Sequence, residues 1–462
     1  MVCFWSYCIN KITILQYNTF RKFYNFYQIL QQLKQFKKIH FIGIGGIGIS
    51  ALVYLSLAEG KVVTGSDTVD STLINSLKEK GAHITIGHDA GNVSDDVELA
   101  IYTEAIDSEN PELKRAKEMG IPAISYFKAL GQISRTKKTI AVVGTHGKTT
   151  VTAMLGLSLI ESGLDPTVIV GSKLKEFGNR NIYIGKEDLM VVEGCEYRRS
   201  FLSLIPFGVV FLNCEAEHLD YYKDEKDYMD AYEELIRQIP SDGFLVANMD
   251  DENVKKLTHH CAGRIVPVDG QYAASLDLQL KVIGNFNYLN AAHAYKAAEE
   301  VEAEPNSIKK ALEDFSGTWR RMEIKGDLNG TLIIDDYGHH PTEIKATLKA
   351  IKEHYKDRRI ICVFQAHQHS RTHMLLDDFV ESFEDADKVL ITDIYKVRDS
   401  EEDVGKIDGE KFAAAIKKNH SDVKWSGNLD ETYKALQDLV ETDDVIVTMG
   451  AGDIDWLSEK LI

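Results

Sequence analysis

The feature that most constrains this chain is a short apolar strand that runs into a glycine-rich loop and then into a long helix. The unit reads TIAVVGTHGKTTVTAMLGLSLIESG and begins at Thr139. Such a loop turns several backbone N–H groups toward one point, and the helix N-terminus adds positive potential there. Lys148 can reach a β- or γ-phosphate, and the Thr149 hydroxyl can ligate Mg2+. The unit predicts a nucleotide phosphate site in a variant form, because Val142 stands where the usual pattern has its first glycine.

The same succession of strand, turn and helix occupies most of the chain. Apolar strands alternate with helices before and after the loop, which is typical of parallel sheets covered by helices on both faces. At roughly 150 residues per domain, 462 residues are expected to form more than one domain. We predict an α/β protein with three domains: a Rossmann-like N-terminal domain over residues 38–136, a central P-loop ATPase-type domain over 137–317 and a Rossmann-like C-terminal domain over 318–462.

Residues 1–37 differ from everything that follows them. They are aromatic and basic and contain no acidic side chain. They lack the ordered basic start, apolar middle and small-residue cleavage site of a signal peptide. We predict a poorly ordered extension, with a basic amphipathic segment on a membrane surface as the alternative.

The balance of charge limits the partners of the chain. It has 71 acidic and 53 basic side chains and a formal net charge of −18, whereas a nucleic-acid surface needs clustered Lys and Arg. No apolar run is long enough to span a bilayer, and the cysteines are scattered without metal-finger spacing. We predict a cytoplasmic protein with free thiols, no nucleic-acid partner and no stable membrane insertion, present as a monomer or a weak homodimer.

A second glycine-rich loop, HFIGIGGIGIS, follows the first predicted strand. Gly43, Gly45 and Gly48 fit the turn that binds a dinucleotide diphosphate, and Asp67 lies where an acid would bind the adenosine ribose. Two interpretations are open on this pattern alone: a nicotinamide cofactor, or the diphosphate of another ligand. The phosphate loop at Lys148 favours the second, because the chain then already has a site for its reactive nucleotide.

Acidic side chains follow two of the predicted central strands. Glu193 ends one strand with Glu196 close behind it, and another strand runs into Glu215, Glu217 and His218. The carboxyl ends of parallel strands lie at one edge of a sheet, which is also the edge of the phosphate loop. Carboxylate oxygens suit Mg2+, so this edge is predicted to hold the ion that accompanies the phosphates.

The C-terminal unit carries two histidine clusters. DDYGHHPTEI holds His339 and His340 at a strand-to-helix turn, and FQAHQHSRT holds His367 and Arg371 just past another strand. Such pairs could bind zinc. Recognition of anionic substrate groups fits better, because arginine binds a carboxylate through two hydrogen bonds.

These motifs, in this order, resemble those of the Mur ligase family. The matching stretches run from about Lys38 to the end and include GTHGKTT, NCEAEHLD, DDYGHHPTEI, FQAHQHSRT and TMGAGDI. The resemblance implies ATP-dependent ligation of L-alanine to UDP-N-acetylmuramate through an acyl phosphate, with Mg2+, in the synthesis of peptidoglycan precursors. The alternatives are a related ligase that attaches a preformed peptide during wall recycling, a nicotinamide-dependent dehydrogenase and a non-catalytic nucleotide-binding regulator.

The resemblance also implies roles for single residues. ATP would contact Gly144, Thr145, His146, Gly147, Lys148, Thr149, Thr150, Asn287, Asn290, Arg320, Arg321 and Asp336. The UDP-linked substrate would contact Gly43, Gly45, Gly46, Ile47, Gly48, Ser66, Asp67, Tyr337 and His339. The Mg2+ ligands would be Thr149, Glu193 and His218. The catalytic residues would be Lys148, His340, His367 and Arg371, with His340 or His367 as the base that frees the alanine amine.

The resemblance gives each domain a ligand as well. The N-terminal domain would hold the UDP moiety, the central domain ATP, and the C-terminal domain the incoming amino acid. Closure about hinges near Lys137 and Gly317 would bring them together.

The chain departs from the family's pattern at a few places. EGCEYRRSF stands where the family often has EADESD, so Arg198 and Arg199 appear and the final aspartate is missing. Phe286 stands where a histidine is usual. No counterpart is evident for the carbamylated lysine of related ligases. These departures affect the finer substrate contacts and leave the implied reaction unchanged.

Overall fold

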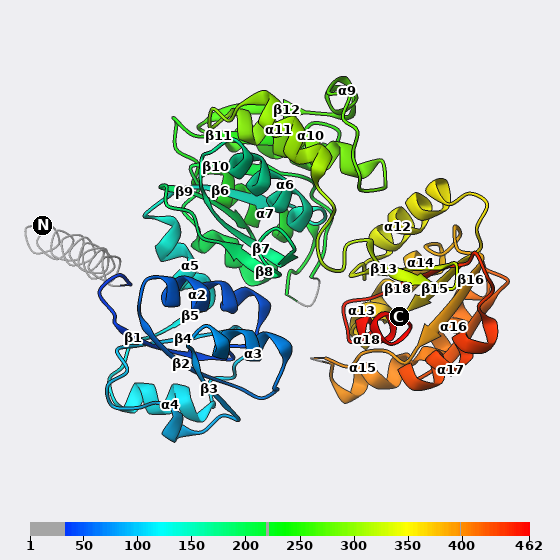
Figure 1. Cartoon of the computed structure of the whole chain (residues 1–462), viewed down its shortest axis with the longest axis horizontal. Coiled ribbons are helices and arrows are strands. Elements are labelled where there is room, and N and C mark those ends of the chain that lie inside the picture. Colours follow the sequence, from blue (N-terminus) through cyan, green and yellow to red (C-terminus); the bar gives the residue numbers. More distant parts are fainter. Residues whose placement is uncertain (1–32, 219–220, 398) are drawn as a thin grey trace, which may run out of the picture.

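The computed structural model describes residues 33–218, 221–397 and 399–462. In these residues three β-sheets follow one another along the chain, each flanked by helices (Figure 1). The predicted α/β architecture of three successive parts is therefore confirmed. Most of the predicted extension, residues 1–32, lies outside the described residues.

The first sheet has five parallel strands in the order β3-β2-β1-β4-β5. Its strands are β1 (Lys38–Ile42), β2 (Val62–Asp67), β3 (His83–Ile86), β4 (Leu99–Tyr102) and β5 (Ala123–Ser125). Its helical elements are α2 (Ile47–Ala58), α3 (Thr72–Glu79), η1 (Ala90–Asn92), α4 (Pro111–Glu118) and α5 (Tyr126–Ser134). The strand order reverses between β1 and β4, so the loop after β1 opens where such sheets bind ligands.

The second sheet has seven strands in the order β12-β11-β10-β6-β9-β7-β8, with only β8 antiparallel to its neighbour. Its strands are β6 (Lys138–Val143), β7 (Thr167–Leu174), β8 (Arg180–Tyr183), β9 (Leu189–Glu193), β10 (Gly208–Phe211), β11 (Phe244–Asn248) and β12 (Arg264–Val268). Its helical elements are α6 (Lys148–Glu161), η2 (Tyr197–Ser203), α7 (Glu225–Ile236), α8 (Glu252–Leu257), η3 (Thr258–His260), α9 (Gly270–Ser275), α10 (Phe286–Glu299) and α11 (Pro305–Asp314). The phosphate loop follows the central strand β6, again at a switch point.

The third sheet has six strands in the order β13-β14-β18-β15-β16-β17, with β13 antiparallel at one edge. Its strands are β13 (Glu323–Leu328), β14 (Thr331–Asp336), β15 (Ile360–Phe364), β16 (Lys388–Thr392), β17 (Val423–Gly427) and β18 (Val445–Met449). Its helices are α12 (Pro341–His354), α13 (His369–Met374), α14 (Leu376–Val380), α15 (Glu401–Lys406), α16 (Gly409–Ile416), α17 (Leu429–Leu439) and α18 (Asp455–Lys460). The two histidine clusters therefore follow β14 and β15, at the carboxyl edge of this sheet.

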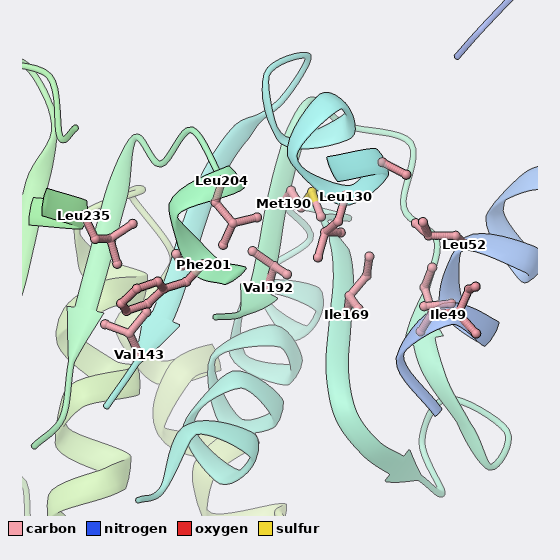
Figure 2. Packing of buried hydrophobic residues seen from close by; sticks show 14 of the residues in the cluster. Ile49, Leu52, Leu130, Val143, Ile169, Met190, Val192, Phe201, Leu204 and Leu235 are labelled. Atoms are coloured by element: carbon pink, nitrogen blue, oxygen red, sulfur yellow. The ribbon is translucent and has the colours of Figure 1, made fainter. Parts of the chain in front are cut away.

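One hydrophobic core runs from the first sheet's helices into the second sheet (Figure 2). Ile49 on α2 and Leu130 on α5 belong to the same buried cluster as Ile169 on β7 and Leu204 just after η2. Separating these surfaces would expose apolar area to water, at a cost of about 25 cal/mol per Å2. The shared core therefore opposes the hinge that the sequence predicted near Lys137.

The segment between α11 and β13 is the linker that joins the central part of the chain to the C-terminal part. Gly317 lies within it at φ +100°, a left-handed conformation that favours glycine. Beyond it, the Ser172 hydroxyl donates to the Trp319 carbonyl oxygen at 2.8 Å, and the Trp319 N–H donates to the Lys173 carbonyl oxygen at 3.1 Å. These bonds tie the end of the linker to β7, and the hinge near Gly317 stays a prediction.

Two sequence expectations concern the environment of the protein. Among the described helices, none combines the length and the apolar character needed to cross a lipid bilayer. The four described cysteines, Cys195, Cys214, Cys261 and Cys362, are free thiols, as predicted.

Candidate active site

The phosphate loop is shaped by two glycines with positive φ. Gly144 has φ +138° and Gly147, which caps α6, has φ +85°. A Cβ on Gly147 would lie 2.8 Å from the Asn290 Oδ1, so the loop packs directly against α10. Asn213, just after β10, fixes the loop, because its side chain accepts the His146 N–H at 2.7 Å. The loop is thus held open at the carboxyl edge of the second sheet.

The ammonium group of Lys148 lies inside this loop. It donates to the carbonyl oxygens of Gly144 at 2.6 Å and Thr145 at 2.9 Å, and to the Glu196 carboxylate at 3.1 Å. Burial alone would lower the pKa of Lys148, but the nearby carboxylates, Glu196 first among them, raise it above its usual value. The side chain is therefore a fixed cation next to the predicted phosphate site.

A cavity of about 380 Å3 opens beside the phosphate loop. It lies between the central part of the chain and the C-terminal part, and the linker at Gly317 forms one wall. The predicted ATP contacts that line it are His146, Gly147, Thr149, Thr150, Asn287, Asn290, Arg321 and Asp336. The remaining loop residues predicted to contact ATP, Gly144, Thr145 and Lys148, lie in the same loop outside that lining.

Arg320 is turned away from this cavity. Its guanidinium is buried in the C-terminal part, where it donates to Asp335 at 2.9 Å and to the carbonyl oxygens of Gly450 at 2.6 Å and Gly452 at 3.0 Å. The predicted ATP contact of Arg320 is corrected on this ground, because its donors are already used to hold the turn after β18. Its neighbour Arg321 lines the cavity.

The predicted metal ligands form two groups. The Thr149 hydroxyl donates to Glu193 at 3.0 Å, and the other oxygen of Glu193 accepts the Gly171 N–H at 2.7 Å. His218 lies instead with Glu196 and Glu217, in a set whose ligand atoms are all within 4.8 Å of one another. The structure thus pairs His218 with carboxylates that the predicted ligand set did not contain.

The buried carboxylate cluster suits a hard cation. Glu196 is 2% exposed, and its Oε2 has no hydrogen-bond partner among the described residues. An unpaired buried carboxylate oxygen is costly, so a ligand for it is expected. Mg2+ prefers such oxygen ligands, and the residues present fit that ion.

Glu217 joins the central part to the C-terminal part. Its carboxylate lies 3.5 Å from His339, 3.8 Å from Arg371 and 3.9 Å from His218. Burial opposes its charge, but His339, His218 and Arg371 lower the pKa of Glu217 far below its usual value, so the carboxylate is ionised. The sequence placed Glu217 in an acidic cluster without showing that it would face the C-terminal histidines.

A second set of bonds ties the phosphate loop to α12. His146 lies 3.0 Å from a Glu215 oxygen and 3.4 Å from a Glu343 oxygen, and the Thr342 hydroxyl donates to Glu215 at 2.8 Å. Burial would lower the pKa of His146, but the two carboxylates raise it to about 9. A charged His146 therefore bridges the two sides of the cavity.

The predicted base His340 has a structural task. It caps α12, where its Nδ1 accepts the Thr342 N–H at 3.4 Å, and Glu343 completes the capping box. Burial, followed by the charge on His146, lowers the pKa of His340, so the ring is neutral. A neutral ring that accepts at Nδ1 carries its proton on Nε2 and offers a donor rather than a base. The prediction that His340 acts as the base is therefore corrected.

The other predicted base, His367, lies against two aromatic rings. It stacks on Tyr395 with a centroid distance of 5.6 Å and lies 6.3 Å from the His339 ring. The predicted substrate residues His339 and Tyr337 form an edge-to-face pair at 5.6 Å. These rings line up along the carboxyl edge of the third sheet, near Arg371.

The loop after β1 is a tight turn, as predicted, but its first amides serve the fold. The N–H groups of Gly43 and Ile44 donate to the Ser66 carbonyl oxygen at 2.9 and 3.0 Å, and the Gly45 N–H donates to Asp67 at 2.8 Å. The Gly46 N–H donates back to Gly43. The expectation that Gly43 and Gly45 turn their amides to a diphosphate is corrected. The amides left for it are those of Ile47 and Gly48 in the first turn of α2, where intrahelical acceptors are lacking.

Ser66 is likewise turned inward. It is fully buried, its hydroxyl donates to Glu112 at 2.5 Å and it lies 3.0 Å from His88. Glu112 is also fully buried and accepts from Asn92 at 2.6 Å. The predicted uridine contact of Ser66 is corrected to a supporting role behind the carboxyl ends of the strands. Glu112, which the sequence did not single out, is the centre of that support.

The phosphate loop, the buried carboxylates beside it and the C-terminal residues facing both define a nucleotide-dependent α/β enzyme. Family models described as the Mur ligase family catalytic domain, the Mur ligase middle domain and the Mur ligase glutamate ligase domain match residues 38–138, 142–270 and 320–452. The chain belongs to the Mur ligase family, and like the members of that family it is an ATP-dependent ligase.

Individual relatives extend over most of the chain. It is 40% identical to the UDP-N-acetylmuramate–L-alanine ligase of Acetivibrio thermocellus over 448 residues, which cover 91% of this chain and 94% of the relative. The structure of UDP-N-acetylmuramate-alanine ligase MurC from Thermotoga maritima superposes with a TM-score of 0.78 at 27% identity, covering 92% of this chain and 98% of that one. A murein peptide ligase from Psychrobacter arcticus shares the fold, with a TM-score of 0.71 at 23% identity and the same coverage.

Proposed function

We propose that this chain joins L-alanine to the carboxylate of UDP-N-acetylmuramate, with cleavage of ATP to ADP and phosphate, in peptidoglycan precursor synthesis. One observation carries the proposal most directly. Glu217 lies beside the phosphate-loop cluster and contacts both His339 and Arg371 across the domain junction, so nucleotide and acceptor groups meet there. The names of the relatives that share 38–40% of the sequence supply the substrates.

The chemistry requires the carboxylate to be activated. A carboxylate is a poor acyl donor, because its leaving group would be oxide. Transfer of the γ-phosphoryl group to a carboxylate oxygen gives an acyl phosphate, and the amine of alanine then attacks its carbonyl carbon. The tetrahedral intermediate collapses with loss of phosphate, and the amine proton passes to a base or to solvent. Such phosphoryl transfer depends mainly on alignment and charge neutralisation.

The residues of the chain divide these tasks. Lys148 neutralises charge on the phosphates, and Asn287, Asn290, Arg321 and Asp336 border the nucleotide. Arg371 has a buried Nη1 without a hydrogen-bond partner among the described residues, which suits it to hold a substrate carboxylate. His367 is the remaining candidate for the base, since His340 is committed to its helix cap.

Mg2+ belongs to this proposal, with Glu196, Glu217 and His218 as one set of donors and Thr149 with Glu193 as a second, separate pair. The ion would supply positive charge at the ATP phosphates. The unpaired Oε2 of Glu196 supports this assignment.

The division of ligands among domains is part of the same proposal. Residues 38–136 would hold the UDP moiety at the α2 N-terminus beside Asp67, residues 137–317 would hold ATP, and residues 318–462 would bind the amino acid. We expect the protein to act in the cytoplasm, as a monomer or a weak homodimer.

The acceptor distinguishes this proposal from a peptide-recycling ligase. With ATP, Mg2+ and UDP-N-acetylmuramate present, L-alanine is expected to raise the rate of ADP release by at least about tenfold over an L-alanyl-γ-D-glutamyl tripeptide at equal concentration, a difference of about 1.4 kcal/mol in activation free energy. ADP is measured by coupled enzymatic assay and the product by mass spectrometry. Faster turnover with the tripeptide would assign the chain to peptide recycling, and a change in NAD(P)H absorbance without ADP would point to a dehydrogenase.

A further inference from the structure

The carboxylate of Asp399 is buried against the start of α13, and its side chain is fully shielded from solvent. One of its oxygens accepts the His369 N–H at 2.9 Å and lies 3.0 Å from the His369 Nδ1. The other accepts the Ser370 N–H at 3.1 Å and the Ser370 hydroxyl at 3.0 Å. Because a carboxylate only accepts, the His369 Nδ1 carries a hydrogen. Asp399 thus holds the first two residues of α13 by four hydrogen bonds.

These bonds also keep Asp399 charged. Burial would raise the pKa of its carboxyl group, but the hydrogen bonds from His369 and Ser370 lower the pKa below its usual value. Hydrogen bonds to an ionised group are stronger than those between neutral groups. Asp399 lies in the loop after β16, 30 residues beyond His369, so it ties two distant segments of the third sheet together.

The residue at the N-cap of α13 does not perform this task. Gln368 stands there, but its side-chain amide donates to the Val397 carbonyl oxygen at 3.4 Å and does not cap the helix. Its φ of +72° lies in the left-handed region, which is costly for a residue other than glycine. The helix covers only six residues, too few to be stable alone. The place of α13 therefore depends on Asp399.

The helix carries Arg371 to the junction between the central and C-terminal parts. Arg371 lies in the first turn, directly after the two residues that Asp399 holds. Its guanidinium lies 3.8 Å from the Glu217 carboxylate, and both side chains border a small hollow. A shift at the start of α13 would move the guanidinium relative to this hollow.

We propose that Asp399 is a positioning residue for the acceptor, because it fixes α13 so that the Arg371 guanidinium can bind the carboxylate of L-alanine. The inference rests on the proposed function, which gives Arg371 a substrate carboxylate to hold. Two parallel hydrogen bonds to a carboxylate require a set orientation of the guanidinium plane, so this contact is sensitive to a small displacement. Asp399 itself acts only through α13.

The test measures ADP release by the full chain while L-alanine is varied at saturating ATP and UDP-N-acetylmuramate. Asp399→Asn keeps the shape of the side chain, but it removes the charge and turns one oxygen into an NH2 group that cannot accept. The KM for L-alanine is expected to rise about 10- to 100-fold, the scale of losing hydrogen bonds to a charged group. The kcat should stay within about threefold of the wild-type value, and the KM for ATP within about twofold.

L-Alaninamide separates positioning from a general structural effect. This acceptor has the amine but lacks the carboxylate that Arg371 would hold. For L-alaninamide, the wild type and Asp399→Asn should therefore differ by less than about twofold in kcat/KM. A change that only loosened the fold would lower activity with both acceptors.

Two further variants complete the test. Asp408→Asn removes a capping carboxylate from α16 in the same sheet, where Asp408 accepts the Lys411 N–H at 2.8 Å, and it should keep the wild-type KM for L-alanine. His369→Leu removes one of the four bonds to Asp399, and His369 does not border the hollow. Its KM for L-alanine should rise by about 3- to 10-fold. Thermal unfolding shows which variants keep the fold.

A wild-type KM for L-alanine in folded Asp399→Asn would overturn the proposal. An equal loss with L-alaninamide, or a rise confined to the KM for UDP-N-acetylmuramate, would overturn it too. If Asp399→Asn does not fold, His369→Leu decides by the same comparison. A wild-type enzyme that does not use L-alanine would refute the proposed function and this inference with it, whereas L-alanine turnover with an unchanged KM in the variant would refute this inference alone.

Discussion

Replacing Lys148 with alanine is expected to lower ADP release by about a thousandfold or more, the scale of removing a charge-stabilising group from a buried reaction site. The ammonium is fixed by two loop carbonyls and by Glu196, so its charge stands at one place beside the predicted phosphate site. The variant also leaves the Glu196 carboxylate without its closest cation. Steady-state ADP formation, measured with saturating ATP and UDP-N-acetylmuramate, gives the turnover number.

The control for this variant removes an equal charge from the surface. Lys226 is 81% exposed at its side chain and forms an ion pair with Asp230, so Lys226→Ala should retain wild-type turnover. Thermal unfolding of both variants shows whether the fold is kept. A folded Lys148→Ala enzyme with turnover near that of the wild type would contradict the assignment of the phosphate loop.

The second large effect is expected for Glu217→Gln. This change keeps the shape of the side chain and removes the charge that faces His218, His339 and Arg371. A neutral amide cannot hold these cationic partners in place at the junction, so turnover should fall by roughly 100- to 1,000-fold, the scale of removing one electrostatic group from a reaction site. Because the partners come from both sides of the junction, the loss should appear in the turnover number, measured by ADP release at saturating ATP, UDP-N-acetylmuramate and L-alanine.

The matched control is Glu252→Gln at the start of α8. Glu252 is 74% exposed at its side chain and lies 3.6 Å from Lys255, so its neutralisation should change turnover by less than about twofold. If Glu217→Gln changed only the affinity for L-alanine and kept wild-type turnover, the carboxylate would be an acceptor-binding group without a part in the junction chemistry.

The fold was predictable because its signals are local. Each phosphate-type loop joins an apolar strand to a helix within a few residues, and positive φ at Gly43, Gly144 and Gly147 explains why glycine stands there. Strand and helix periods in the sequence therefore sufficed for the three successive sheets. The packing of α2 on β7 and β8 depends on side chains that are far apart in sequence. The hydrophobic core that joins the first two parts of the chain (Figure 2) was therefore not predictable.

Adjacent residues were the hardest to assign. Arg320 and Arg321 cannot be told apart in the sequence. In the structure Arg320 donates hydrogen bonds to Asp335 and to two carbonyl oxygens, whereas Arg321 borders the cavity. Ser66 and Asp67 also differ in the direction of their side chains. The Ser66 hydroxyl donates to the buried Glu112, whereas the Asp67 carboxylate accepts the Gly45 N–H. Which way a side chain points at a strand end is decided by tertiary contacts.

The contacts of buried polar residues could not be predicted from the sequence either. Glu217 was visible as one acid in a cluster, but its contacts with His339 and Arg371 join segments more than a hundred residues apart. Such contacts leave no mark in local sequence patterns.

The central claim is that the substrate carboxylate is phosphorylated by ATP before the amine attacks. UDP-N-acetylmuramate labelled with 18O in both lactyl carboxylate oxygens tests it in a single turnover with ATP, Mg2+ and L-alanine. One labelled oxygen is expected in each phosphate released and one in the amide carbonyl of the product, read by mass spectrometry. Unlabelled phosphate, with the second label released as water, would contradict the account.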